Sequence, residues 1–192
     1  MIRIAVVGDI GSGKSYVAKL FGYPVFNADN EVSRIYKKNK KCFNKLKKML
    51  PLHIFSFPIK KNEILKAIVD GKHNLKKIIK VVHPEVQYQM KKFLKKNKKK
   101  KCIILDIPLL MENKINKKTD ILIFVQADKN EITRRLKKRN GFNLKVINKF
   151  KKIQLSAEIK KRKSNYIVKN NFKHDFIKKS VKNIKRNILL NA

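Results

Sequence analysis

The sequence predicts an α/β protein in which helices cover both faces of a parallel sheet. Three observations lead to this prediction. Short apolar runs typical of buried strands begin at residues 2, 102 and 121. Helical apolar patterns separate these runs along the chain, and a glycine-rich loop joins the first run to the first helix. Strands that alternate with helices form parallel sheets whose strands are buried on both faces.

The glycine-rich loop lies between a strand and a helix. Ile2 to Val7 is rich in β-branched residues and predicts the strand, and apolar residues from Val17 to Phe21 recur at helical spacing. Strand, loop and helix is the order that a P-loop requires. A chance glycine turn before a helix is the alternative. The segment between the predicted strand and helix fits the pattern G-x-x-x-x-G-K-[ST] at every fixed position and reads Gly8, Asp9, Ile10, Gly11, Ser12, Gly13, Lys14, Ser15.

Each fixed residue of this loop has a chemical reason. Glycines let the backbone N–H groups wrap closely around phosphate oxygens, and the N-terminus of the following helix adds a favourable dipole. Lys14 is expected to contact the β- and γ-phosphates, and the Ser15 hydroxyl to bind Mg²⁺. The motif indicates a nucleoside triphosphate as ligand, and we assign its binding to the whole loop and to Tyr16, which follows it.

Composition sets the broad class of the protein. The chain has 192 residues and is 43% hydrophobic, which is enough for one sizeable core. We find no run of 18 apolar residues, and the strand and loop begin at Ile2, where a signal peptide would lie. Cys42 and Cys102 are far apart and lack metal-ligand spacing. We therefore expect a cytoplasmic protein with no membrane partner. A monomer is our working expectation, although nothing in the sequence shows the oligomeric state.

The formal net charge of +37 has two interpretations. A basic surface attracts nucleic acid, but a compositional bias can also fill exposed positions with lysine. Only seven of the 50 basic residues are arginine, whereas base-reading surfaces favour the planar fork of arginine. The lysines are spread along the chain without an RNA-binding aromatic signature. We prefer the compositional interpretation and expect no specific nucleic-acid partner.

The first half of the chain continues with one strand and several helices. Tyr23 to Asn27 predicts a second strand, and a helix follows from Asp29 to about Tyr36, with Asp29 or Asn30 as its N-cap. The next helices are predicted around residues 43–50, 61–69 and 75–82, with a break at Pro84 and a further amphipathic helix over 85–94.

The second half returns to alternating strands and helices. Strands are predicted over 102–106, 121–125 and 166–168, and helices over 129–138, in a charged stretch over about 140–163, and at the C-terminus. Residues 40–100 contain no convincing strand. We therefore expect a single domain with a core of about 1–37, 101–138 and 164–192, a helical substrate-binding insertion over about 38–100, and a lid over about 139–163.

Four polar groups outside the loop are candidates for a site, and each has a structural alternative. Asp29 follows the second strand, at the sheet edge where α/β proteins bind ligands, but it can also cap a helix. Asp106 ends the third strand and is a candidate Mg²⁺ ligand or a turn former. His83-Pro84 can bind substrate or stop a helix. The arginines Arg134, Arg135 and Arg139 can close over a triphosphate or form a solvated helix face.

Taken together, these motifs resemble the dephospho-coenzyme A kinase family over nearly the whole chain. The resemblance joins the glycine loop with Ala28-Asp29 after the second strand, His83-Pro84 in the insertion, and the segment Asp106-Ile107-Pro108-Leu109-Leu110-Met111-Glu112. An arginine-bearing helix and lid follow, and Gln154 precedes Asn170 by sixteen residues. The chain departs from the family pattern at Asn27, where the family has an acid, and at Ser164-Asn165, where it has Ala-Asp.

The resemblance implies a reaction and assigns residues to it. ATP would phosphorylate the 3′-hydroxyl of the ribose of dephospho-coenzyme A, with Mg²⁺ bound at Ser15 and Asp106. Asp29 would be the catalytic base, assisted by Lys14 and Arg139, while Arg135 and Asn170 would bind ATP. Substrate binding would fall to Asp29, His83, Pro108 and Leu109. Another P-loop kinase of a small molecule or nucleoside monophosphate, and a basic nucleic-acid-binding P-loop protein, remain the alternatives.

Overall fold

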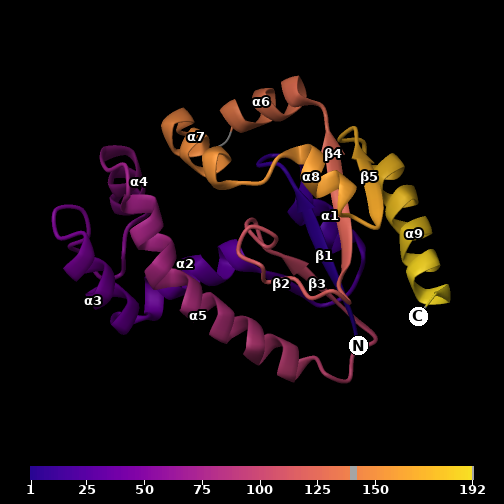
Figure 1. Ribbon diagram of the computed structural model, residues 1–192, viewed down its shortest axis with the longest axis horizontal. Coiled ribbons are helices and arrows are strands. Elements are labelled where there is room, and N and C mark those ends of the chain that lie inside the picture. The colour runs from indigo at the N-terminus through magenta and orange to yellow at the C-terminus, as the bar shows by residue number, and fades with distance from the viewer. Residues whose placement is uncertain (139–141, 192) are drawn as a thin grey trace. The chain divides into compact units, whose positions relative to one another are not determined.

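A computed structural model describes residues 1–138 and 142–191 and contains a five-stranded parallel sheet with helices, as the sequence predicts. The strand order is β2-β3-β1-β4-β5, so the first strand of the chain is central. Ala5 of β1 pairs with Leu105 of β3 on one side and with Leu122 of β4 on the other. Figure 1 shows the sheet with α9 alongside its β5 edge. The glycine loop therefore leaves the sheet from its middle strand.

Both faces of the central strand are buried, because successive side chains of a strand point to opposite faces. Ile4 and Val6 belong to an apolar cluster that includes buried residues of α1 and α9. Ala5 and Val7 are also buried, and α8 packs against β1. This burial on both faces accounts for the continuous apolar runs in the sequence.

The described chain forms two compact units, and the sheet lies in the first. This unit covers residues 1–27, 97–142 and 153–192. Its elements are β1 (Ile2–Gly8), α1 (Lys14–Leu20), β2 (Val25–Asn27), β3 (Cys102–Asp106), β4 (Ile121–Ala127), α6 (Lys129–Lys137), α8 (Ala157–Arg162), β5 (Tyr166–Asn170) and α9 (His174–Leu190).

The second unit is helical and covers residues 28–96 and 143–152. Its helices α2, α3 and α4 all pack against the long helix α5. Lys149 connects α7, which comes from the second segment of this unit, to α4 in the first segment. Its Nζ donates hydrogen bonds to the carbonyl oxygens of Ile68, Val69 and Gly71 at the end of that helix. The elements are α2 (Ala28–Lys38), α3 (Lys40–Met49), α4 (Lys61–Asp70), α5 (Asn74–Lys96) and α7 (Leu144–Ile153).

Three details differ from the sequence predictions. The predicted break at Pro84 is wrong, because α5 continues through this proline with buried residues on both sides of it, from Leu75 to Val86. The charged stretch over 140–163 contains two helices, and Ser156 caps the second by accepting from Ile159 N. Helix α2 begins at Ala28, so Asp29 lies inside its first turn and not before it. An acid in the first turn still complements the helix dipole.

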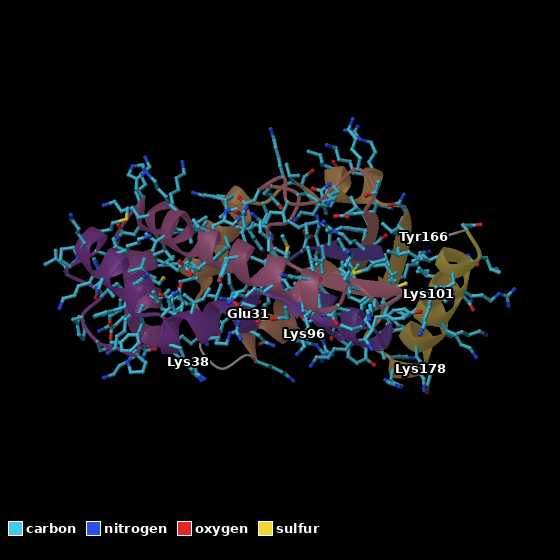
Figure 2. The ribbon with its side chains drawn as sticks, turned by 90° about the horizontal axis from the view of Figure 1, so that it is seen from below. Glu31, Lys38, Lys96, Lys101, Tyr166 and Lys178 are labelled. Atoms are coloured by element: carbon cyan, nitrogen blue, oxygen red, sulfur yellow. The ribbon has the colours of Figure 1, made fainter. Side chains whose placement is uncertain are left out.

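The basic side chains come from many elements. Figure 2 labels Lys38, Lys96, Lys101 and Lys178, which lie at the end of α2, at the end of α5, just before β3 and in α9, and all four are exposed. Among the residues that the structure describes, no helix is long and apolar enough to span a membrane.

Candidate functional site

The glycine loop has the backbone geometry that its sequence predicts. Gly8, Gly11 and Gly13 have φ angles of 150°, 86° and 89°, a region that other residues rarely adopt. A Cβ atom on Gly8 would lie 2.8 Å from the carbonyl oxygen of Val125, and one on Gly13 would lie 2.3 Å from Asn170 Nδ2. Glycine is therefore required at both positions by close contacts as well as by backbone angles.

Polar contacts hold the loop in a defined shape. The Asp9 carbonyl oxygen accepts hydrogen bonds from Ser12 N at 3.1 Å and from Lys14 Nζ at 2.8 Å. Asn170, the last residue of β5, donates from Nδ2 to the Ser12 carbonyl oxygen at 2.7 Å. Ser12 Oγ is buried and has no hydrogen-bond partner among the described residues. A buried hydroxyl inside a glycine loop is a donor suited to an anionic oxygen.

A pocket of about 490 Å³ lies next to this loop. Asn170 connects the two, because its side chain lines the pocket and also contacts Ser12. Arg135 and Phe172 also line the pocket, with the Arg135 guanidinium carbon 4.0 Å from the ring centroid of Phe172. The other lining residues are Asp128, Glu131, Arg134 and Asn171.

The aromatic wall of the pocket has a strained backbone. Phe172 has a φ angle of 61°, in the left-handed region where large residues are outliers. The amide N–H of Phe172 donates to Asn170 Oδ1 at 2.8 Å, which fixes this turn. Strained residues of this kind gather at ligand-binding sites. The pocket therefore offers an aromatic face, a guanidinium and side-chain amides beside the loop.

The arginines of α6 are organised by one carboxylate. Arg134 makes a two-pronged contact with Glu131, at 2.9 Å from Nε and 2.8 Å from the terminal nitrogen, and Arg135 Nε lies 3.7 Å from the same carboxylate. The Arg134 hydrogen bonds lower the pKa of Glu131. Both arginines are exposed, so they remain accessible to an anion.

Asp106 ends β3 at the same edge of the sheet as the loop, because β3 runs parallel to β1 beside it. Its carboxylate is buried and accepts a 2.5 Å hydrogen bond from Asn27 Nδ2, its partner in the β2–β3 register. Among the described residues, no three His, Cys, Asp or Glu side chains are grouped to hold a metal ion. One carboxylate and the Ser15 hydroxyl nevertheless fit Mg²⁺, which binds through few protein ligands and substrate phosphates.

The segment after Asp106 contacts the chain that leads into α8. Gln154 Nε2 donates to the Pro108 carbonyl oxygen at 3.2 Å, and Glu112 Oε1 accepts from Leu155 N at 2.9 Å. Pro108 and Leu109 are half-buried. Pro108 therefore contacts Gln154, and Glu112 contacts the next residue of the chain, Leu155, within the first unit.

Two of the candidate residues lie in the second unit. Asp29 is exposed in the first turn of α2, two residues after Asn27 in the chain. His83 lies in the middle of α5, with its Nε2 3.2 Å from Gln87 Nε2, and burial lowers its pKa. His83 is therefore neutral over most of the physiological pH range, because its pKa lies below the usual value of about 6.5.

Arg139 and Tyr16 are the two remaining candidates from the sequence. Arg139 lies outside the residues that the structure describes. The hydroxyl of Tyr16 contacts Nδ1 of His174 at the start of α9. The sequence analysis missed Phe172 and Lys160. No sequence pattern indicates Phe172. Lys160 lies six residues after Gln154, which the sequence analysis had already selected.

Comparisons with known proteins agree on one family. A family model described as dephospho-CoA kinase matches residues 2–175. Dephospho-CoA kinase of Wolbachia pipientis wMel is 32% identical over 98% of this chain and 99% of its own length. The enzyme of the same name from Wolbachia sp. subsp. Brugia malayi is 30% identical over 98% of this chain and 99% of its own length.

Two solved structures have a similar fold. A crystal structure of a protein from Thermus thermophilus matches with a TM-score of 0.75 and 26% identity, covering 99% of this chain and 97% of the other. A dephospho-CoA kinase from Campylobacter jejuni matches with a TM-score of 0.61 over 98% of each chain. At 20% identity, the second match supports the fold alone.

Proposed function

The chain belongs to the dephospho-CoA kinase family, and we propose that it transfers the γ-phosphoryl group of ATP to the 3′-hydroxyl of the ribose of dephospho-CoA. The products are ADP and CoA. The observation that carries the proposal is the glycine loop, whose three left-handed glycines follow the central strand of the sheet. Phosphoryl transfer requires positioning and charge neutralisation more than covalent chemistry, and such a loop supplies both.

The phosphate groups of ATP would bind along the loop. Its backbone N–H groups, with the buried hydroxyl of Ser12, supply donors to phosphate oxygens. Lys14 Nζ, which donates to the Asp9 carbonyl in the structure, would contact the β- and γ-phosphates. Asn170 would keep the loop in shape through its hydrogen bond to Ser12.

The adenine base would occupy the pocket beside the loop. The ring of Phe172 offers a face for stacking, and the Arg135 guanidinium, which lies over one face of this ring, adds a positive charge. The side-chain amides of Asn170 and Asn171 can pair with the polar edge of a base. The pocket volume of about 490 Å³ is within the range of small-molecule sites.

Asp106 and Ser15 would hold Mg²⁺, which neutralises negative charge on the phosphates when it is bound. Asn27 orients the Asp106 carboxylate through its amide hydrogen bond. In this arrangement one carboxylate oxygen is engaged by the protein and the other is left for the cation.

The acceptor hydroxyl would meet Asp29. An exposed carboxylate can accept the proton of the ribose hydroxyl as the new bond forms to phosphorus. His83, Pro108 and Leu109 would contact the rest of dephospho-CoA, and Arg139 would cover the charge that develops during transfer. A neutral His83 can donate one hydrogen bond and accept another.

An ADP-release assay with ATP and Mg²⁺ tests this function. We expect turnover with dephospho-CoA and none with adenosine or AMP. Lys14→Ala should lower the rate by about 10²-fold or more, as loss of one phosphate contact does in comparable sites. The control is Lys19→Ala, which removes an exposed lysine of the same helix. Turnover with AMP in preference to dephospho-CoA would assign the enzyme to the nucleoside monophosphate kinases.

The high positive charge favours a second candidate, nucleic-acid binding, which the same preparation can test. Because the exposed lysines are spread over many elements, we expect weak RNA binding that fades as salt rises to physiological strength. Sub-micromolar RNA binding at that salt, unaffected by Lys14→Ala, would support the nucleic-acid function instead.

A further inference from the structure

Lys160 of α8 is buried, whereas most lysines of the described chain are exposed. Its side chain is 1% exposed, and within residues 1–138 and 142–191 it is the one fully buried lysine. Removing an ammonium group from water is costly unless carboxylates or other partners compensate for it. A position so unfavourable for lysine indicates a specific use of its charge.

Two carboxylates surround the Lys160 ammonium. Its Nζ lies 3.3 Å from Glu112 Oε1 and 4.0 Å from Asp9 Oδ1. Neither contact has the geometry of a hydrogen bond, so Nζ has no hydrogen-bond partner among the described residues. Glu112 Oε1 is also bound by Leu155 N at 2.9 Å, which fixes that carboxylate. Lys160 is therefore held between a fixed acid and the acid of the glycine loop.

Asp9 is an unexpected residue in a loop that binds phosphate. Its carboxylate is 39% exposed, and its backbone carbonyl accepts the hydrogen bonds from Lys14 and Ser12 that shape the loop. An uncompensated carboxylate on this loop would repel a triphosphate bound to the loop, because like charges at short range oppose each other.

We propose that Lys160 is a positioning residue for ATP, which compensates the charge of the Asp9 carboxylate on the glycine loop. This inference rests on the proposed function of the loop as the ATP site. It assigns to α8, a helix far from the loop in sequence, a part in nucleotide binding. Glu112 contributes by pairing with the Lys160 ammonium at 3.3 Å.

The test is ATP affinity, measured by titration calorimetry without acceptor, together with thermal unfolding. Lys160→Met keeps the length of the side chain but removes its charge, and it should weaken ATP binding about tenfold or more. Lys160→Arg should retain most of the affinity. Adding Asp9→Asn to Lys160→Met should restore much of it, because the acid that needed compensation is gone. The matched control is Lys161→Met, at the exposed next residue, which should bind like the wild type.

The outcomes separate this inference from the proposed function. Failure of the wild type to bind ATP would overturn the proposed function. A wild type that binds ATP, with Lys160→Met binding equally well, would overturn the role of Lys160. Weak binding that Asp9→Asn does not restore would mean that Lys160 serves only the packing of α8, and would also overturn it.

If Lys160→Met fails to fold, a second variant allows the same test. Combining Glu112→Gln with Lys160→Met removes the carboxylate that would otherwise face the apolar Met side chain. ATP affinity is then compared in this double variant with and without Asp9→Asn. Restoration of ATP affinity by Asp9→Asn there supports the proposal. If this variant is unfolded too, Lys160 is required by the fold and the proposal is wrong.

Discussion

The amide of Asn27 donates a 2.5 Å hydrogen bond to the carboxylate of Asp106, and the two residues are partners at the ends of neighbouring strands. An amide at position 27 can donate to this carboxylate, whereas an acid there would face it with like charge. Asp106 is therefore the one carboxylate of this pair. Because position 27 carries no acid, a substitution at Asp106 tests the proposed metal ligand by itself.

Asp106→Asn should lower turnover by about 10²-fold at fixed Mg²⁺, because it removes the charge that attracts the cation. The fold should survive, since an amide at position 106 can still accept from Asn27. The measurement is the dependence of rate on Mg²⁺ concentration, which should shift to higher concentration. Asp175→Asn, at an exposed acid of α9, is the control. An unchanged Mg²⁺ dependence would leave Asp106 as a turn former.

Phe172→Ala should weaken ATP binding by about tenfold, within the 1–3 kcal/mol typical of stacking between a base and an aromatic ring. Binding of inorganic tripolyphosphate should change little, because that ligand contacts only the loop. Titration with both ligands separates the base pocket from the phosphate site. Phe176→Ala removes an exposed ring from α9 and should affect neither ligand. Equal loss of both ligands would show that Phe172 only supports the loop.

Glu63 should stabilise the helical unit in a pH-dependent way. Burial raises its pKa, but hydrogen bonds from the Ser56 hydroxyl and from backbone N–H groups, including that of Phe55 at 3.0 Å, outweigh burial and lower it overall. A lowered pKa gives stability that is present above the unfolded value of about 4.3 and is lost as pH falls through the folded value.

The comparison is urea unfolding of wild type and Glu63→Gln at pH 7 and pH 3. At pH 7 the variant should be less stable by about 1–3 kcal/mol, and at pH 3 the difference should shrink. Glu158→Gln changes an exposed acid and should have little effect. A difference that stays the same at both pH values would mean that shape, not charge, holds Ser56.

Elements with a strong local signal were predictable from the sequence. The strands around residues 2, 102 and 121 are mostly apolar, and the glycine loop has a fixed spacing, so both were placed correctly. Pro84 misled the prediction because a proline removes only one helical hydrogen bond, while packing of α5 against α2, α3 and α4 keeps the helix continuous.

The remaining features depend on contacts that sequence patterns do not carry. Lys160 looks like any other lysine of a basic helix, and its burial follows from Glu112, 48 positions earlier in the chain. The left-handed backbone of Phe172 is set by the turn after β5 and not by a glycine. In both cases a specific partner, distant in sequence for Lys160 and two residues away for Phe172, fixes a residue whose type suggests a different environment.

Asp29 and the glycine loop are proposed to divide the work between acceptor and donor, and Asp29→Asn tests this division most directly. Asparagine keeps the size and polarity of the side chain in the first turn of α2 but cannot take the proton. ATP affinity should stay nearly unchanged, while turnover with saturating dephospho-CoA should fall by about 10²- to 10⁴-fold. Turnover close to the wild-type rate would contradict the account, because the ribose hydroxyl would then need another base.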